Sequence, residues 1–269
     1  MAQPLQVVQQ QTLPPEATQL AGTYQLGEPL VDYKVGLTRR MRTYIVIGII
    51  GAIICAALTV VIFISPQDKD SMSSTLLFGV FTLGFLALAV SNLCYPLLYK
   101  GWHVYVCKEG FIFTTGKKNE PFRWDAIAGV WLEIKNYSSY GVKVGSTYKY
   151  TVQRNDGEKL VLDEKFIEVD ALGNTVTQET TQSMLPRTLE DFNAGKTIAF
   201  GPLSLNQQGI SNGKNMLPWS EVSGIGINKG MVLVGKKGKK LNWLTIEVAK
   251  VPNVFVFDAL ARSLVSAQN

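Results

Sequence analysis

Residues 44–64 read YIVIGIIGAIICAALTVVIFI and contain no charged side chain over 21 positions. A helix of this length crosses a hydrocarbon core of about 30 Å. The run is longer than the apolar part of a secretory signal, and 43 residues precede it. We therefore predict a membrane-spanning helix that stays in the mature protein.

A second apolar run, residues 76–99, is also free of formal charge and predicts a second span. Basic residues gather outside this pair: Lys34, Arg39, Arg40 and Arg42 precede it, Lys100, Lys108, Lys117 and Lys118 follow it, and only Lys69 lies between the spans. Because Lys and Arg are retained on the cytoplasmic side, both termini are expected in the cytoplasm. The sequence thus predicts a multi-pass protein of the cell membrane.

Small residues recur on one stripe of the first span, at Gly48, Ala52 and Ala56, and a similar pair, Ala87 and Ser91, lies on the second. Small side chains let two helix backbones approach closely. We interpret the stripe as packing within one helical hairpin, with homodimerisation as the alternative.

Composition divides the chain into five segments. Residues 1 to about 30 are rich in Gln, Pro and Thr, with few aromatic residues, so a disordered tail is expected. This tail is predicted to reach residue 43 and to end in a basic juxtamembrane cluster, which we interpret as an orientation signal rather than a lipid site. The other predicted segments are a two-helix anchor over 44–99, a first domain over 100–182, a connector over 183–196 and a second domain over 197–269.

Beyond residue 100, apolar and polar residues alternate in short runs, which is typical of β-strands. Asn155-Asp156-Gly157 indicates a hairpin turn, because these residue types tolerate positive φ. Apolar spacings of three and four then predict a helix from about Lys165 into the low 180s. The strands of this first group are expected at 102–106, 111–115, 130–134, 148–152 and 160–162.

The same order of elements returns in the second half. Residues 124–130 read WDAIAGV and residues 219–225 read WSEVSGI, so a duplicated domain is predicted. Tryptophan and glycine are also common at such places in unrelated β domains. The second group of strands is expected at 197–200, 203–205, 223–227, 231–234 and 241–247, before a helical stripe of Val254, Phe257, Leu260 and Leu264. The predicted structural positions of the repeat are Gly110, Trp124 and Gly129 in the first copy and Gly209, Trp219 and Gly224 in the second.

A strand-rich unit with this Trp turn and a closing helix resembles the pleckstrin-homology-like (PH-like) modules of bacterial membrane proteins. The segments FGPLS at 200–204 and LPW at 217–219, after a two-span anchor, are similar to a bacterial membrane protein family without an assigned function. The resemblance implies an α+β membrane protein with tandem PH-like antiparallel β-barrels, each closed by a C-terminal helix. It implies no phosphoinositide binding, because a basic first-hairpin pattern is missing around residues 108–110.

Residue types and charge argue against several function classes. The net charge of +5 suits an anionic membrane surface better than nucleic acid, and no nucleic-acid partner is expected. The single histidine, His103, has no second imidazole to share a metal, and Asp163-Glu164 fits a helix start. Cys55, Cys94 and Cys107 form no CxxC pair, which indicates a reducing compartment. We expect no catalysis, no cofactor and no metal.

The strongest surface feature is a run of four lysines on a predicted hairpin tip: Lys236, Lys237, Lys239 and Lys240. Each is worth about 1 kcal/mol close to an anionic membrane. The plainer interpretation is a solvated turn, because exposed hairpin tips often carry lysine. The sequence thus predicts a bilayer-anchored module that binds a protein partner. The alternatives are a sensor of anionic headgroups through these lysines and, less favoured, an accessory subunit of an enzyme or transporter.

Overall fold

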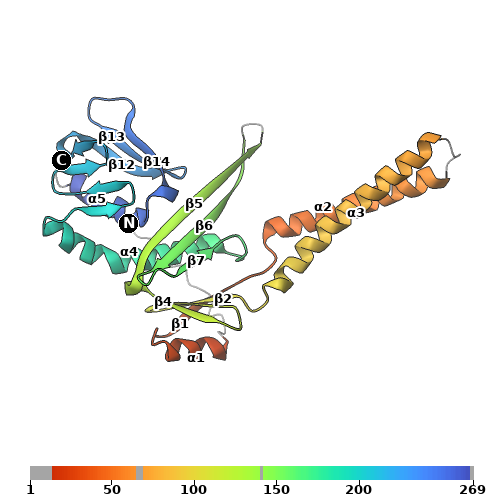
Figure 1. Ribbon diagram of the computed structural model, residues 1–269, viewed down its shortest axis with the longest axis horizontal. Coiled ribbons are helices and arrows are strands. Elements are labelled where there is room, and N and C mark those ends of the chain that lie inside the picture. Colours follow the sequence, from red (N-terminus) through yellow and green to blue (C-terminus); the bar gives the residue numbers. More distant parts are fainter. Residues whose placement is uncertain (1–13, 65–68, 140–141, 267–269) are drawn as a thin grey trace.

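The computed structural model describes residues 14–64, 69–139 and 142–266 of the chain. An antiparallel pair of long helices extends from a body made of β-sheets and three further α-helices (Figure 1). The paired helices are α2 (Arg39–Ile64) and α3 (Lys69–Leu98). Helix α2 contains the first predicted span, α3 ends one residue before the end of the second, and both begin several residues earlier.

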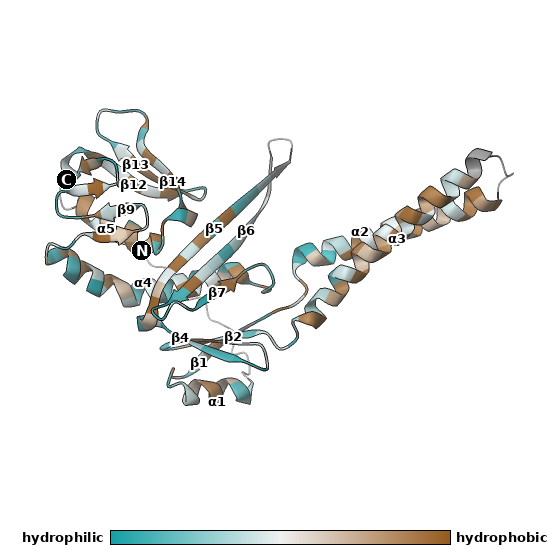
Figure 2. Ribbon diagram, in the orientation of Figure 1, coloured by the Kyte–Doolittle hydropathy of each residue, from teal (hydrophilic) through white to brown (hydrophobic). Residues whose placement is uncertain are grey.

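Helices α2 and α3 are long and apolar enough to cross a membrane. Only 11% and 6% of their most apolar windows are buried, whereas a core helix of a soluble protein is mostly covered. Figure 2 shows apolar residues along both helices. Exposed apolar surface of this extent is unfavourable in water, which indicates that a bilayer or another chain surrounds the pair.

Small residues bring the two helices together, as predicted, but with a different partner on α3. Gly48 and Ala52 are buried, and a Cβ at Gly48 would lie 2.8 Å from the Phe85 carbonyl oxygen and 2.9 Å from Ala89. Ala89 is itself 7% exposed. The stripe was extended wrongly, because the remaining members are exposed: Ala56, Ala87 and Ser91.

The prediction of a disordered tail is wrong for residues 14–35, while residues 1–13 lie outside the described part. Helix α1 (Pro15–Thr23) buries Ala17 and Ala21 against a small apolar cluster that includes Tyr105 and Ile112. Strand β1 (Pro29–Lys34) then pairs antiparallel with β2 (His103–Cys107). Composition suggested disorder because the apolar partner of this segment lies far along the chain.

The first sheet has the strand order β1-β2-β3-β4, with β3 at Gly110–Thr114 and β4 at Asn119–Arg123. Strands β1 and β2 are neighbours in space but are separated along the chain by α2 and α3. Lys34 pairs with His103, so both ends of the helix pair are tied to one pair of strands. The helix pair is therefore an insertion between two adjacent strands of the sheet.

A second sheet joins β5 (Ile127–Ser139), β6 (Val142–Arg154) and β7 (Lys159–Leu162). The long β5–β6 hairpin rises beside the helix pair (Figure 1). The predicted turn between β6 and β7 is confirmed, since Gly157 has a φ of 92° and its N–H donates to the Arg154 carbonyl at 3.0 Å.

Helix α4 (Val169–Asn193) begins later and ends later than predicted, so the expected connector over 183–196 is mostly helical. Leu172 and Val176 near its start and Phe192 near its end are buried, and its apolar residues between them are partly buried: Met184, Leu185 and Leu189. Beyond α4 come β8 (Ile198–Phe200), β9 (Leu203–Leu205), β10 (Gly209–Ser211), β11 (Met216–Pro218), β12 (Val222–Asn228), β13 (Met231–Lys236), β14 (Asn242–Glu247) and α5 (Val254–Ser266).

The two halves share one element order: a four-stranded sheet, a 3-10 turn that begins with Trp, a three-stranded sheet and a helix. The prediction of closed barrels is wrong within the described residues, because each half forms two separate open sheets. One continuous apolar core extends from Val104 in the first half to Ala261 in the second. The two units therefore pack as one body.

Candidate functional site

The two predicted tryptophans occupy equivalent places. The indole N–H of Trp124 donates to the Lys108 carbonyl at 3.1 Å, and that of Trp219 donates to the Asn206 carbonyl at 2.8 Å. Both rings are buried. These bonds satisfy a buried indole donor and fix the turn between the two sheets of each unit.

The predicted glycines also have structural roles. Gly110 and Gly209 face the neighbouring strand so closely that a Cβ would collide with the carbonyl oxygen of Phe122 or Leu217. Gly129 and Gly224 each follow a register shift near the start of β5 or β12, where a bulge bends the strand. The glycines and tryptophans of the repeat shape the framework.

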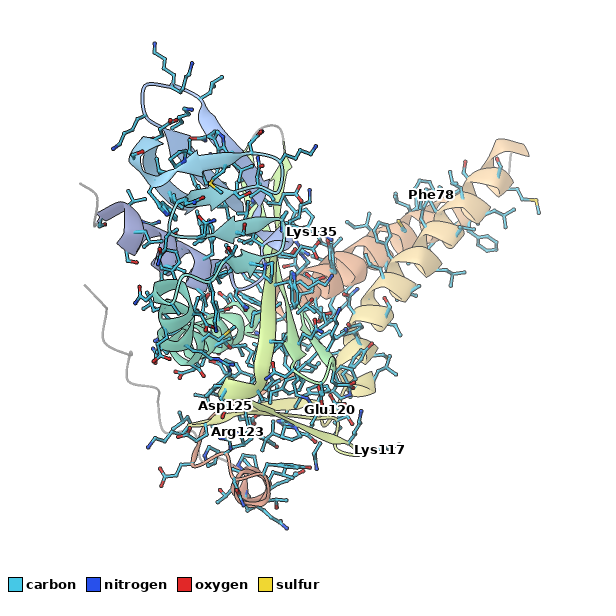
Figure 3. All side chains as sticks on the ribbon, turned by 60° about the vertical axis from the view of Figure 1, so that its left-hand side comes forward. Phe78, Lys117, Glu120, Arg123, Asp125 and Lys135 are labelled. Atoms are coloured by element: carbon cyan, nitrogen blue, oxygen red, sulfur yellow. The ribbon has the colours of Figure 1, made fainter. Side chains whose placement is uncertain are left out.

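The predicted lysines lie on the β13–β14 turn, remote from the helix pair in both views of the body (Figures 1 and 3). Lys236 forms an ion pair with Glu221 at 2.6 Å. Lys237, Lys239 and Lys240 are exposed, and the next residue, Leu241, is 84% exposed. We call these four exposed residues the lysine tip. An apolar side chain at a cationic tip suits contact with another molecule more than free solvation.

Where the helix pair meets the body, side chains from distant segments form a second cluster. Arg40, near the start of α2, pairs with Glu164 at 3.0 Å and lies 4.9 Å from the centre of the Tyr137 ring on β5. Lys165 pairs with Asp163 at 2.9 Å. This junction cluster ties the first helix to the β5–β6–β7 sheet.

Aromatic rings continue the junction along α3. Tyr95 and Tyr99 lie 4.9 Å apart, Tyr99 and Trp102 lie 4.8 Å apart, and Trp102 meets Phe113 of β3 at 5.3 Å. The ammonium of Lys165 lies 5.7 Å from the centre of the Tyr99 ring. These rings thus lie between the end of α3 and the first sheet.

A cavity of about 200 Å³ opens beside the junction cluster. We call it the junction pocket. Figure 3 shows Lys135, one of its residues, on the side of the body that faces the helix pair. Its lining comes from β5, β6 and the segment before α4: Glu133, Lys135, Tyr137, Thr147, Tyr148, Lys149, Asp163 and Glu164.

Charges in the junction pocket are unevenly paired. Glu133 accepts from both Lys135 at 3.1 Å and Lys149 at 3.0 Å, and these two ammonium groups hold the pKa of Glu133 below its usual value. A hydrogen bond with the Thr147 hydroxyl lowers the pKa of Tyr137, and Arg40 lowers it further. The pocket therefore offers ammonium, carboxylate and hydroxyl groups.

The family model described as "Family of unknown function (DUF6585)" matches residues 1–269, which covers both the helix pair and the body. The chain belongs to the DUF6585 family. No match was found among curated proteins or among solved structures. Membership in DUF6585 assigns no activity, so the function of this member is argued from its geometry.

The reactive side chains His103 and Cys107 are held in structural contacts in this DUF6585 chain. His103 Nδ1 lies 2.9 Å from Asp32 Oδ1 across the β1–β2 pair, and its ring stacks on Tyr105. Burial raises the pKa of the Cys107 thiol to about 11, which disfavours the reactive thiolate. Within residues 14–64, 69–139 and 142–266, there is no group of three His, Cys, Asp or Glu side chains that could hold a metal.

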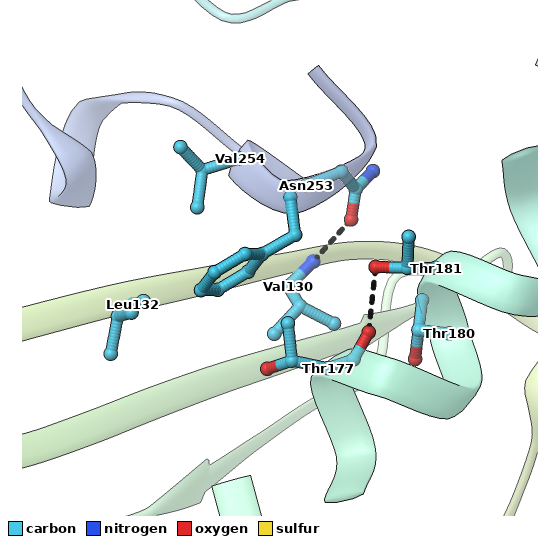
Figure 4. Close-up of a pocket in the computed structure, with 8 residues that line it drawn as sticks. Val130, Leu132, Thr177, Thr180, Thr181, Asn253 and Val254 are labelled. Atoms are coloured by element: carbon cyan, nitrogen blue, oxygen red, sulfur yellow. Dashed lines mark hydrogen bonds between the residues drawn. The ribbon is translucent and has the colours of Figure 1, made fainter. Parts of the chain in front are cut away.

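A smaller cavity, of about 10 Å³, lies between α4, α5 and β5 (Figure 4). Asn253 lines it and donates or accepts three hydrogen bonds with β5. Thr180 also lines it, is 2% exposed, and has a hydroxyl without a hydrogen-bond partner. This volume holds at most about one water molecule, so the cavity is part of the interface between the units.

The sequence indicated the lysine tip but missed the junction pocket. Its one local signal is the alternation on β5, where Glu133, Lys135 and Tyr137 occupy every second position and so share a face. Nothing local indicates that Arg40 and Glu164, which are 124 positions apart, come together at the pocket.

Proposed function

We propose that this chain is a membrane-anchored, non-catalytic interaction module that binds an acidic protein partner through the lysine tip. Helices α2 and α3 span the cell membrane, and the body, a tandem of PH-like units, lies on the cytoplasmic side with both termini. The observation that carries the proposal is the exposed Leu241 among exposed lysines, on a turn remote from the helix pair.

The placement of the helix pair supports the anchoring role. Because β1 and β2 are paired neighbours, the chain leaves and re-enters the body at one place, as a two-span hairpin requires. Arg40 and Lys165 link both helices to the body through ion pairs and ring contacts. A body held in this way presents one fixed face away from the bilayer.

The repeated framework supports the tandem PH-like organisation. The matched indole hydrogen bonds and the matched crowded glycines occur at the same step of each half. Each half ends in a helix that packs on its sheets.

The position of the lysine tip favours a protein partner over the bilayer that holds the anchor. The tip lies across the body from the helix pair, while electrostatic attraction to a membrane fades within a Debye length of about 8 Å. An acidic partner with an apolar pocket for Leu241 satisfies both charge and apolar contact.

Site-specific photo-crosslinking tests this proposal. A photoreactive amino acid replaces Leu241 in the full chain, in membranes of the source cells, and the same group at Lys214 is the matched control. We expect one identified protein to crosslink at 241 only. The purified pair should then bind in a salt-sensitive manner, and Lys237→Glu, Lys239→Glu and Lys240→Glu together should weaken binding at least about tenfold.

Two outcomes would overturn the protein-binding role. One is equal crosslinking at 241 and 214, or partner binding that the three substitutions leave unchanged. The other comes from the full chain in phosphatidylcholine nanodiscs that are mixed with phosphatidylglycerol vesicles. If the nanodiscs capture the vesicles in a salt-sensitive manner and the triple variant does not, the anionic-lipid sensor is favoured instead.

A further inference from the structure

The junction pocket is placed at the depth of lipid headgroups if α2 and α3 span a bilayer. Arg40 follows the first residue of α2, and the ring series from Tyr95 to Trp102 marks the end of α3. Basic and aromatic residues at such positions lie in the interfacial layer of a membrane. A ligand in this pocket would reach it from the bilayer surface.

Size and polarity restrict what this pocket can hold. At about 200 Å³ it is smaller than the usual pocket for a drug-sized molecule, and its walls carry charged and hydroxyl groups. A small polar headgroup fits, with its acyl chains left in the bilayer. An acyl chain does not, because charged side chains line the walls.

Side chains of both signs of charge line the pocket. Lys135 and Lys149 share a single carboxylate, Glu133, so each ammonium keeps N–H donors that can turn to a phosphate while Glu133 stays paired. Glu164, which also lines the pocket, is 58% exposed and uses one oxygen, Oε2, for Arg40. The other oxygen of Glu164 can accept from an ammonium group, with Asp163 beside it.

We propose that the junction pocket binds the phosphoethanolamine headgroup of a membrane phospholipid, with Lys135 and Lys149 on its phosphate and Glu164 on its ammonium. Charge-assisted hydrogen bonds to a carboxylate need N–H donors, which ethanolamine has and choline lacks. A purely anionic headgroup brings no ammonium group to Glu164 and is repelled by its carboxylate. The proposal rests on the spanning role of the helix pair and is independent of the lysine tip.

The test uses the delipidated full chain in detergent, titrated with short-chain phosphatidylethanolamine, phosphatidylcholine or phosphatidylglycerol. Bound lipid is counted by native mass spectrometry. We expect one saturable phosphatidylethanolamine site whose Kd is about tenfold lower than for either other lipid, a difference of about 1.4 kcal/mol.

Three variants separate the parts of the site. Lys135→Ala with Lys149→Ala should remove the saturable site, and Glu164→Gln should remove the preference over phosphatidylglycerol while leaving binding itself. Lys237→Ala with Lys239→Ala, at the lysine tip, is the matched control and should bind as the unmodified chain does. Circular dichroism checks that each variant is folded.

The proposal is overturned if the three lipids bind equally, if phosphatidylglycerol binds most tightly to the unmodified chain, or if the Lys135 and Lys149 variant keeps the site. Loss of partner binding by lysine-tip variants leaves this result unchanged. The two proposals can therefore fail separately.

Discussion

Asn253 holds Val130 through both backbone groups of that strand residue. The Val130 N–H donates to Asn253 Oδ1 at 2.8 Å, and the Asn253 N–H donates to the Val130 carbonyl at 2.8 Å. The Asn253 amide also donates to the Ala128 carbonyl at 3.1 Å. One residue before α5 thus connects the second unit to β5 of the first.

Asn253→Gly should lower the free energy of unfolding by about 2 kcal/mol, because two side-chain hydrogen bonds to the backbone of Val130 and Ala128 are lost. Asn253→Ala should cost roughly 1 kcal/mol more, since the φ of 51° at this position is unfavourable for alanine but open to glycine. Urea unfolding of the full chain in detergent, followed by tryptophan fluorescence, measures both. Equal stability of the Gly and Ala variants would contradict the assigned backbone strain.

Gly173→Ala should destabilise the protein by about 2 kcal/mol, although alanine favours helices by roughly 1 kcal/mol. A Cβ at Gly173 on α4 would overlap the Tyr150 ring, which is 2% exposed and cannot move aside. Gly22→Ala in α1 is the control, because that Cβ would meet nothing within 4 Å. The packing argument fails if both substitutions stabilise in thermal denaturation.

Gly48→Val should lower the melting temperature of the detergent-solubilised chain by several degrees, because the new side chain separates α2 from α3 at the Phe85 carbonyl. Gly79→Val, where a Cβ meets no neighbour within 4 Å, should leave it unchanged. Light scattering should show the same oligomeric state for both variants. A change of oligomeric state at Gly48 alone would support the homodimer alternative.

Thr18 and Lys214 should face the same side of the membrane, because the β1–β2 pair joins both ends of the helix pair to one body. After replacement of the native cysteines, Thr18→Cys and Lys214→Cys should react with a membrane-impermeant maleimide from one side only. Lys69→Cys, at the start of α3, should react from the other side. Labelling of Thr18→Cys and Lys214→Cys from opposite sides would exclude a two-span anchor.

Two glutamates should respond to pH with opposite signs. Burial raises the pKa of Glu179, so its charge opposes folding above that pKa, and Glu179→Gln should stabilise at pH 7. Lys149 and Lys135 lower the pKa of Glu133, so Glu133→Gln should destabilise at pH 7. The stability difference between Glu179→Gln and the unmodified chain should shrink as pH falls through the raised pKa of Glu179. The corresponding difference for Glu133→Gln should disappear only below the lowered pKa of Glu133. Urea midpoints from pH 3 to pH 7 check both differences. A stability change of the same sign in the two variants would refute the opposite pKa shifts of Glu179 and Glu133.

The sequence by itself determined the features that depend on neighbouring residues. Length and apolarity are local properties, so the two long helices were found together with the turn at Gly157. Ten of the fourteen strands in the described residues and the Trp-Gly repeat were also readable, since each copy carries its own residues, whereas β1, β4, β10 and β11 were missed. The lysine tip was located because charge at a hairpin turn needs no distant partner.

Only the tertiary structure decided which distant segments share a surface. β1 has too little apolar surface to predict a strand, and β2, which pairs with it, lies beyond the helix pair. The length of α4, the shared core and the junction pocket likewise depend on contacts such as Arg40 with Glu164. Local composition cannot encode these pairings, because their stability comes from burial and charge neutralisation between segments that meet only after the chain has folded.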